Sequence, residues 1–222
     1  MIAAPDPAPA MTDRRRGPGR CAGLVVKLGG SLLGSPHLVA WLDALAASRG
    51  AAVVVAGGGP FADAVREAQR RRPFSDSTAH RMAILAMEQY AWMLSALNPA
   101  LRPAASRAGI AALRRAGRTP VWLPGRMTFD AEDLPESWDL TSDSLAIWLA
   151  GALRIRRVLL VKSATLPAGE AGAADLAKAG IVDPLVPEFL RRTGADCRCI
   201  GDDRAANFFA GQAADTRLTT GP

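Results

Sequence analysis

Cysteine, lysine and long hydrophobic segments are all scarce in this sequence of 222 residues. The three cysteines include no Cys-x-x-Cys pair, which argues against a disulfide framework and indicates a reducing compartment. No apolar run approaches the roughly 18 residues that a membrane span needs, because the run at 82–87 is bounded by Arg81 and Glu88. Hydrophobic residues at 49% and charged residues at 22% are typical of folded globular proteins, so disordered and fibrous classes are excluded.

Lysine is the rare basic residue, with only Lys27, Lys162 and Lys178 among 27 basic residues. Where any positive charge would serve, the chain has arginine, so a lysine at a special position suggests a role for a compact ammonium group. The net charge is +6, but residues 1–20 hold four Arg and two Asp, which leaves +4 for the remainder. This charge is too diffuse to indicate nucleic-acid binding.

Residues 1–20 are rich in Pro, Ala and Arg and lack the order of a signal peptide. We predict a disordered leader, a cytoplasmic protein and one domain over 21–222. Short, continuously apolar runs begin at residue 24 and are typical of strands covered on both faces. They predict a three-layer α/β/α sandwich with a mainly parallel sheet, whose strands are 24–28, 51–56, 119–124, 157–162 and 197–200.

Helices are predicted between these strands from capping and breaker residues. Ser35 and Pro36 open one helix that reaches about residue 48, and Gly59-Pro60 opens a second. Further helices are predicted over 76–97, 104–116, 141 or 142 to 151, and 203–211. Cys197 and Cys199 would share one face of the last strand, yet no histidine lies near them, so we expect buried thiols and no metal site.

Two glycine clusters follow two of the predicted strands: Gly29-Gly30-Ser31 and Gly57-Gly58-Gly59. Both lie at the carboxyl edge of a parallel sheet, where ligands bind. Glycines there let backbone N–H groups converge on an anion, and the helix that starts at Pro60 adds its positive end. The alternative is that the glycines only make tight turns. Two clusters at one edge favour anion binding.

Two lysines and an aspartate extend this predicted site. Lys27 and Lys162 lie at strand ends on the same rim, where a buried ammonium needs an anion, although each could also extend to the surface. Lys178 is interpreted as a solvated helical residue. Asp143 falls in the first turn of its helix, where it caps the helix end or bridges the two lysines.

Four separated motifs resemble the amino acid kinase family, which includes acetylglutamate, uridylate and isopentenyl phosphate kinases. They are KLGGS at 27–31, GGGPFAD at 57–63, LTSDSLA at 140–146 and LLVKSA at 159–164, and they occur in family order over about residues 22–220. The resemblance implies the fold given above and in-line transfer of a γ-phosphoryl group from ATP with Mg²⁺. It also implies a homo-oligomer, because family relatives commonly pair.

The resemblance implies roles for the motif residues. Lys27, Asp143 and Lys162 would form the catalytic group, with Asp143 organising the lysines. The nucleotide and phosphates would be held by Gly29, Gly30, Ser31, Gly57, Gly58, Gly59 and Ser163. Two departures stand out: the segment after Lys162 lacks the further lysine of larger members, and LLGSPHLV at 32–39 lacks the additional lysine of isopentenyl phosphate kinases.

The acceptor is indicated by position 63, where uridylate kinases have Arg and isopentenyl phosphate kinases have His. Asp63 attracts a cation, so we expect a small phosphorylated acceptor with an ammonium group. Asp76 and His80, one helical turn apart, are candidates for the same pocket, with an N-cap and a core or surface histidine as alternatives. Aromatic stacking is possible on Phe61, Tyr90 or Trp138, and the acceptor phosphate has three candidate arginines, Arg66, Arg81 and Arg126.

Two alternatives to this interpretation stay open. One is another kinase of the family, acting on a nucleoside monophosphate or a carboxylate. The other is a nucleotide-binding or storage subunit without catalysis.

Overall fold

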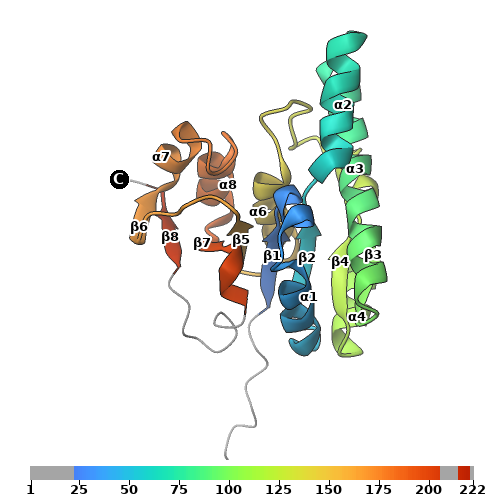
Figure 1. Ribbon diagram of the computed structural model, residues 1–222, viewed down its shortest axis with the longest axis vertical. Coiled ribbons are helices and arrows are strands. Elements are labelled where there is room, and N and C mark those ends of the chain that lie inside the picture. The colour runs from blue at the N-terminus through green and yellow to red at the C-terminus, as the bar shows by residue number, and fades with distance from the viewer. Residues whose placement is uncertain (1–22, 206–214, 221–222) are drawn as a thin grey trace, which may run out of the picture.

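The computed structural model describes residues 23–205 and 215–220, in which eight strands form one sheet in the order β3-β4-β2-β1-β5-β7-β8-β6 (Figure 1). All neighbouring strands are parallel except β7 and β8. The mainly parallel sheet is therefore confirmed. The strands are β1 (Leu24–Leu28), β2 (Ala52–Ala56), β3 (Leu101–Ala104), β4 (Thr119–Trp122), β5 (Arg157–Lys162), β6 (Gly169–Gly172), β7 (Asp196–Gly201) and β8 (Thr216–Thr219).

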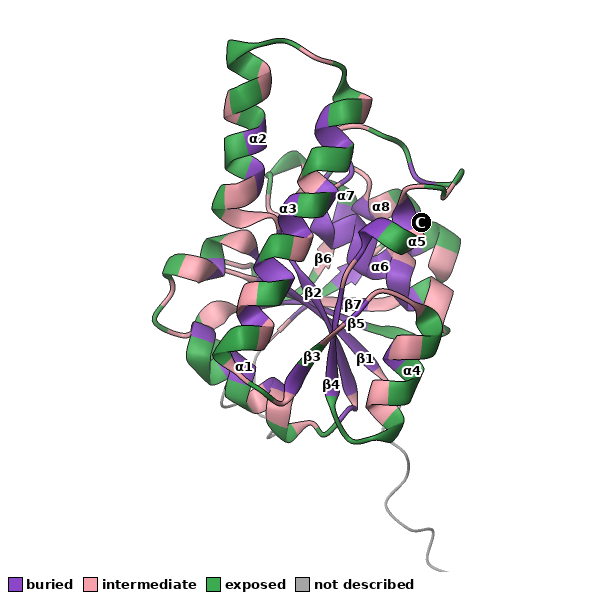
Figure 2. Cartoon of the chain, turned by 90° about the vertical axis from the view of Figure 1, so that its right-hand side faces the viewer, coloured by how far each residue is buried: buried purple, intermediate pink, exposed green. Residues whose placement is uncertain are grey.

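Helices cover both faces of the sheet, which gives three layers. They are α1 (Leu38–Ala47), α2 (Gly59–Arg71), α3 (Asp76–Leu97), α4 (Arg107–Arg115), α5 (Gly125–Thr128), α6 (Ser142–Leu153), α7 (Ala173–Lys178) and α8 (Val186–Thr193), with 3-10 turns η1 (Gly30–Gly34) and η2 (Asp202–Arg204). Buried residues concentrate in the strands and on the inner sides of the helices (Figure 2). This burial is the physical basis of the continuous apolar runs in β1, β2 and β5.

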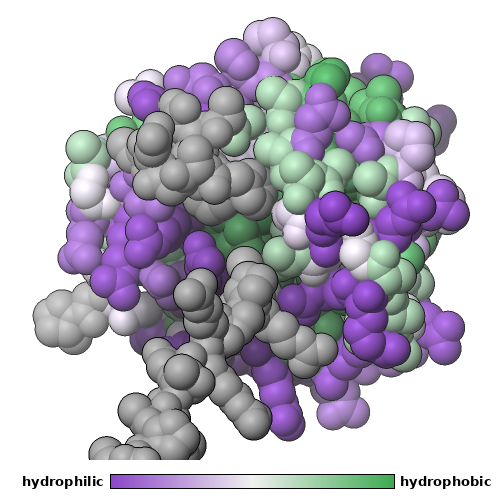
Figure 3. Space-filling view, turned by 90° about the horizontal axis from the view of Figure 1, so that it is seen from below, coloured by the Kyte–Doolittle hydropathy of each residue, from purple (hydrophilic) through white to green (hydrophobic). Residues whose placement is uncertain are grey.

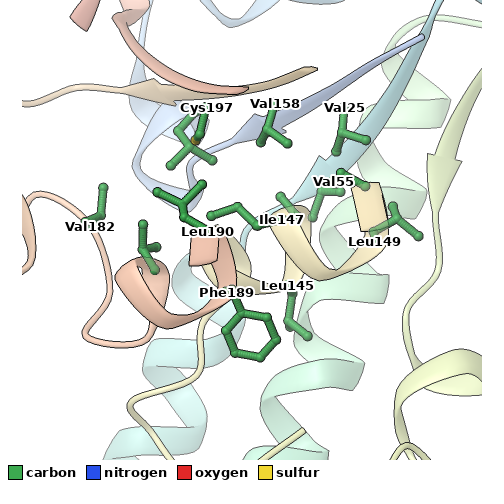
Figure 4. Packing of buried hydrophobic residues seen from close by; sticks show 14 of the residues in the cluster. Val25, Val55, Leu145, Ile147, Leu149, Val158, Val182, Phe189, Leu190 and Cys197 are labelled. Carbon is green, nitrogen blue, oxygen red and sulfur yellow. The ribbon is translucent and has the colours of Figure 1, made fainter. Parts of the chain in front are cut away.

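Two hydrophobic clusters occupy the two faces of the sheet. In one, α6 and α8 pack on β1, β2 and β5, and Figure 4 shows Ile147 on the side of α6 that faces Val158 of β5, with Leu145 on the other side near Phe189 of α8. In the other, α1 and α3 pack on the opposite face, with Trp41 fully buried. The α6 face is the one that matters for function, because both strand lysines point to it.

Three strands were not predicted: β3, β6 and β8. β3 was assigned in part to a helix starting at 104, but α4 begins at Arg107 after its N-cap Ser106. Pro103 fits β3 because this strand is at the edge of the sheet and pairs only with β4. β6 and β8 are short, and β6 is exposed or half-buried along its length, so neither carries an apolar run.

Two helix boundaries also differ from the prediction. The first helix begins at Leu38 rather than beside Ser35, because residues 30–34 form a 3-10 turn and the Ser35 hydroxyl donates a hydrogen bond to Asp202. α6 continues to Leu153 instead of ending at Gly151. The predicted leader and most of the predicted helix at 203–211 lie outside the described residues.

Helices α2 and α3 lie side by side and extend beyond the carboxyl ends of β1 and β2 (Figures 1 and 2). No helix in the described part of the chain combines the length and apolar character that crossing a bilayer requires. From below, toward the edge where β1 begins, the visible described surface mixes hydrophilic side chains with more hydrophobic ones (Figure 3). The opposite edge of the sheet carries the candidate site.

Candidate active site

Lys27 and Lys162 point to the same face of the sheet. Side chains alternate along a strand, so Lys27 of β1 shares a face with Val25, and Lys162 of β5 shares a face with Leu160. Val25 and Leu160 both belong to the cluster beneath α6. Because β1 and β5 are adjacent parallel strands, the two ammonium groups meet at the carboxyl edge of the sheet under the start of α6.

Asp143, in the first turn of α6, lies between the two lysines. Its Oδ1 is 2.9 Å from Lys27 Nζ, and its Oδ2 accepts a hydrogen bond from Lys162 Nζ. The side chains of Lys27, Asp143 and Lys162 are only 8%, 4% and 11% exposed. Two ammonium groups and one carboxylate leave a net charge of +1 in a position where an unpaired charge is costly. The geometry is therefore suited to receiving an anion.

Burial and the neighbouring charges shift the pKa values of Lys27 and Asp143. Burial lowers the pKa of the Lys27 ammonium, and the neighbouring Lys162 charge acts in the same direction, while Asp143 opposes both. Burial acts to raise the pKa of Asp143, but the two ammonium groups outweigh it and hold that pKa below its usual value. Asp143 is therefore ionised at neutral pH and available to hold both lysines.

A second buried carboxylate, Asp183, fixes the start of α6. It accepts hydrogen bonds from the backbone N–H groups of Thr141 and Ser144 and from both hydroxyls, with Oδ2 3.0 Å from each nitrogen. Burial and the charge of Asp143 raise the pKa of Asp183. Asp183 was not among the site residues predicted from the sequence. Its only local signal is the Asp-Pro pair at 183–184, which is typical of a turn.

The two glycine loops pack directly against each other. A Cβ added to Gly30 would lie 2.2 Å from the Gly59 nitrogen, and one added to Gly57 would lie 2.5 Å from the Gly30 nitrogen. Gly59 also has a φ of +54°, in the region that favours glycine. Gly58 precedes α2 as its N-cap. The glycines thus make close turns, and these turns place the backbone of both loops at one edge, so the two interpretations are compatible.

The loops after β1 and β5 are also joined. The Oγ atoms of Ser31 and Ser163 share a hydrogen bond of 2.8 Å, and both side chains are accessible to solvent. Ser163 follows Lys162, and Ser31 follows the first glycine pair, Gly29 and Gly30. The residues predicted to hold the nucleotide therefore lie together at this edge of the sheet.

A cavity of about 600 Å³ opens beside the glycine loops. It lies between η1, α2, α3 and the segment that leads into α6, and its polar lining includes Ser31, Asp63, Arg66, His80 and Thr141. Its size is in the range of small-molecule sites. Lys27, Asp143 and Lys162 are not among its lining residues, but Gly30, Ser31 and Ser142, which follow or precede them closely in the chain, are. The cavity therefore supplies space for a small molecule at the same edge of the sheet.

Asp63 and Arg66 form a charged pair at the cavity wall. Arg66 Nη1 donates to Asp63 Oδ1 at 3.0 Å, and the guanidinium lies 4.5 Å from the centre of the Trp138 ring, which also lines the cavity. Of the three candidate arginines, Arg66 is the one among the described lining residues. Arg81 instead pairs with Glu136.

Of the other residues predicted to bind the acceptor, some line the cavity and some do not. His80 lines the cavity, its Nδ1 shares a hydrogen bond with the Ser137 carbonyl, and burial lowers its pKa. Asp76 does not line the cavity, because the exposed first turn of α3 directs its carboxylate to the amide of Gln69 on α2. The N-cap of α3 is Ser75 rather than Asp76. Of the three aromatic candidates only Trp138 lines the cavity, while Phe61 and Tyr90 pack in the core beside α1.

The described residues contain no group of three His, Cys, Asp or Glu side chains that could hold a metal ion. Both carboxylate oxygens of Asp143 are engaged by lysines. Any Mg²⁺ would be held mainly by nucleotide phosphates and water. Cys197 and Cys199 are fully buried free thiols, as predicted, and burial raises the pKa of Cys199 to about 12.

The fold and this site combine features that are typical of small-molecule phosphotransferases: buried lysines at the edge of a mainly parallel sheet, adjoining glycine turns and a cavity of small-molecule size. The family model described as amino acid kinase family matches residues 23–164. The chain belongs to this family.

One curated relative is similar to part of this chain. Over 141 residues the chain is 26% identical to the [5-(aminomethyl)furan-3-yl]methyl phosphate kinase of Methanocaldococcus jannaschii. The match covers 61% of this chain and 63% of that protein, so less than two thirds of the relative is spanned.

Solved structures match the fold more completely. Uridylate kinase from Archaeoglobus fulgidus has a TM-score of 0.68 at 15% identity, with 89% of this chain and 100% of that chain covered. UMP kinase from Bacillus anthracis has a TM-score of 0.66 at 12% identity, with coverages of 90% and 97%. At these identities the likeness concerns the fold alone, and it confirms the predicted amino acid kinase-like architecture.

Proposed function

We propose that this protein is an ATP-dependent kinase that phosphorylates (5-(aminomethyl)furan-3-yl)methyl phosphate to its diphosphate, a step in the synthesis of methanofuran-type cofactors. The observation that supports phosphoryl transfer is the buried Lys27–Asp143–Lys162 group, in which two ammonium groups share one carboxylate. The cavity opens at the neighbouring residues Gly30, Ser31 and Ser142. The curated relative supports the choice of acceptor.

The reaction follows from this geometry. A phosphate oxygen of the acceptor attacks the γ-phosphorus of ATP in line, the bond from that phosphorus to the bridging oxygen breaks, and ADP leaves with the electron pair. Lys27 and Lys162 neutralise the charge that develops on the transferring group and the leaving phosphate. Asp143 holds the two ammonium groups in place before substrate arrives. The amides of the loops at 29–31 and 57–59 provide further donors.

The acceptor end of the proposal rests on Asp63 and Arg66. Their mutual ion pair joins side chains that are 72% and 51% exposed, so opening it costs at most about 1 kcal/mol. An acceptor with both an ammonium group and a phosphate would replace this internal pair by two pairs, ammonium to Asp63 and phosphate to Arg66. Trp138 lines the cavity, and its ring, over which the Arg66 guanidinium lies, would stack on the furan when Arg66 turns to the phosphate.

Three further parts of the proposal accompany this reaction. Mg²⁺ would arrive with ATP, since the described residues lack a metal-binding cluster of their own. Cytoplasmic location and a homo-oligomeric state stay predictions.

The test is a coupled ADP-release assay with three acceptors: the aminomethylfuran phosphate, UMP and isopentenyl phosphate. We expect turnover with the first. Preference for UMP would favour a uridylate kinase instead, and tight ATP binding without turnover of any acceptor would favour a nucleotide-binding subunit. Either result would refute the proposal.

A pair of variants tests the acceptor assignment. Asp63→Asn removes the partner of the ammonium group and is expected to raise KM for the amine-bearing acceptor about tenfold or more, while KM for ATP stays unchanged. Glu67→Gln is the matched control, because this carboxylate lies one turn further along α2 and does not line the cavity. Equal acceptor kinetics in the two variants would contradict the role of Asp63.

A further inference from the structure

Asp183 makes an unusually complete set of hydrogen bonds for a single carboxylate. Its Oδ2 accepts from Thr141 N at 3.0 Å, Thr141 Oγ1 at 2.8 Å and Ser144 N at 3.0 Å. Its Oδ1 accepts from the Ser144 hydroxyl and from Leu185 N at 3.2 Å. The residue is only 7% exposed. All of these donors except Leu185 N belong to the start of α6.

These contacts do for α6 what a capping side chain does for other helices. The first N–H groups of a helix have no partner within it, and a side chain just before the helix commonly accepts from them. Thr141 is at the N-cap position of α6 but makes no such side-chain bond. The cap comes instead from Asp183, which lies between α7 and α8.

The location of Asp143 gives this remote cap a functional consequence. Asp143 stands between Thr141 and Ser144, the two residues that Asp183 holds. Its carboxylate must reach Lys27 on β1 and Lys162 on β5 at the same time. A small shift of this helix turn would lengthen one ion pair or both.

We propose that Asp183 is a positioning residue that locks the first turn of α6 and so holds the Asp143 carboxylate between the two lysines. The inference deepens the proposed function and rests on it for the effect on rate. The five hydrogen bonds of Asp183 within the described residues go to the start of α6 and to Leu185 N, so it acts through the position of Asp143.

The charge of Asp183 is unfavourable so close to Asp143, so the value of this carboxylate lies in the hydrogen bonds that it accepts. It is a second carboxylate near Asp143, and burial together with that neighbouring charge raises its pKa. A neutral cap such as Ser106, which accepts from Gly109 N at the start of α4, satisfies a helix end without this repulsion. A single serine hydroxyl, however, could not accept all the donors that Thr141 and Ser144 present.

Three variants test the proposal. Asp183→Asn replaces one acceptor oxygen by a donor, and Ser144→Ala deletes one contact without changing any charge. Ser106→Ala is the matched control, because it removes the cap of a different helix that supplies nothing to the cavity lining. Far-UV circular dichroism and thermal melts show whether each variant is folded at the assay temperature.

In the kinase assay, Asp183→Asn is expected to lower kcat on the order of 10²-fold and to leave KM for ATP within about threefold of wild type. Ser144→Ala should lower kcat by about three- to tenfold. In an Asp143→Asn background, Asp183→Asn should have little further effect, because the residue it positions is already lost. A merely structural residue would lower the melting temperature, as we expect of Ser106→Ala, with kcat of the folded protein unchanged.

The sequence has only three lysines, so NMR of labelled lysine side chains provides a measurement that does not depend on activity. ¹³Cε-lysine labelling gives signals from Lys27, Lys162 and Lys178 only, and Lys178 is 80% exposed, so it is an internal reference. Ser144→Ala and Asp183→Asn should shift the Lys27 and Lys162 signals and leave that of Lys178 in place. Ser106→Ala should shift none.

These outcomes separate the two proposals. If the wild type turns over no acceptor, the proposed function fails, and the lysine signals still decide the role of Asp183. Unchanged Lys27 and Lys162 signals in folded Asp183→Asn would overturn the positioning role. If Asp183→Asn does not fold, Ser144→Ala decides: wild-type kcat and wild-type lysine signals in that variant would overturn it equally.

Discussion

Replacing Asp143 by asparagine should destabilise the protein strongly, and the loss should depend on pH. Asparagine keeps the size of the side chain but leaves Lys27 and Lys162 without a counter-charge. The Lys27 Nζ to Asp143 Oδ1 distance of 2.9 Å corresponds to about 6 kcal/mol of Coulomb attraction at an effective dielectric of about 20. Breaking a buried pair typically costs about 3–5 kcal/mol.

Proton loss sets an upper limit on this destabilisation. A lysine of ordinary pKa, about 10.4, can shed its proton at about pH 7.5 for roughly 4 kcal/mol. The folded variant is therefore expected to release one lysine proton that the unfolded chain keeps, so the unfolded state binds more protons and stability rises with pH. The free-energy difference from wild type should narrow by up to about 1.4 kcal/mol per pH unit as long as the wild type keeps both lysines charged.

Urea unfolding of both proteins at about pH 7.5, 8.5 and 9.5 measures these differences. The control is Asp175→Asn, which breaks a second aspartate–lysine pair whose two side chains are both 80% exposed and 3.7 Å apart. It should change stability by less than about 0.5 kcal/mol at every pH. The reasoning is refuted if Asp143→Asn behaves like this control, or if its large cost stays constant over the pH series.

Gly30→Ala should destabilise the fold and abolish activity, because its Cβ would lie 2.2 Å from the backbone of the neighbouring glycine loop, whereas Gly34→Ala, with nothing within 4 Å of its Cβ, should stay folded. Thermal melts of the two variants check this. Cys197 and Cys199 should resist alkylation in the native protein at about pH 8, because burial raises both pKa values, and react after unfolding. Site-resolved mass spectrometry detects the difference, and rapid native labelling would contradict it. The alkaline fall of kcat should occur below the pH expected for a lysine of pKa 10.5, because burial lowers the pKa of Lys27 and its charged form is the active one. A rate profile that stays level to that pH would count against it.

The elements that were predictable share a local cause. β1, β2 and β5 are buried on both faces, so their residues form continuous apolar runs, and α3 was predicted over its observed range of 76–97. Edge strands are partly exposed, so their sequences contain no continuous apolar run. β6 is accessible to solvent, and the proline in β3 is tolerated only because that strand has a single partner.

The candidate site also contains some residues that were predictable from the sequence and others that were not. Lys27 and Lys162 were identifiable because lysine is rare here and because each ends an apolar strand, and the bridging position of Asp143 was one of two stated alternatives. The role of Asp76 was not predictable, since helical spacing relates it to His80 but says nothing of Gln69 on a neighbouring helix. Arg66 could not be separated from other arginines without knowing which side chains border the cavity.

The sequence by itself determined the order of its motifs along the chain, the glycines that its tight loops require and the two lysines near the ends of buried strands, because these features depend on neighbours in sequence. Only the tertiary structure showed that Asp183 lies at the start of α6, next to Asp143. Asp183 reaches α6 from a segment some 40 residues further along the chain, and such a contact depends on packing in three dimensions, which leaves no periodic trace in the sequence.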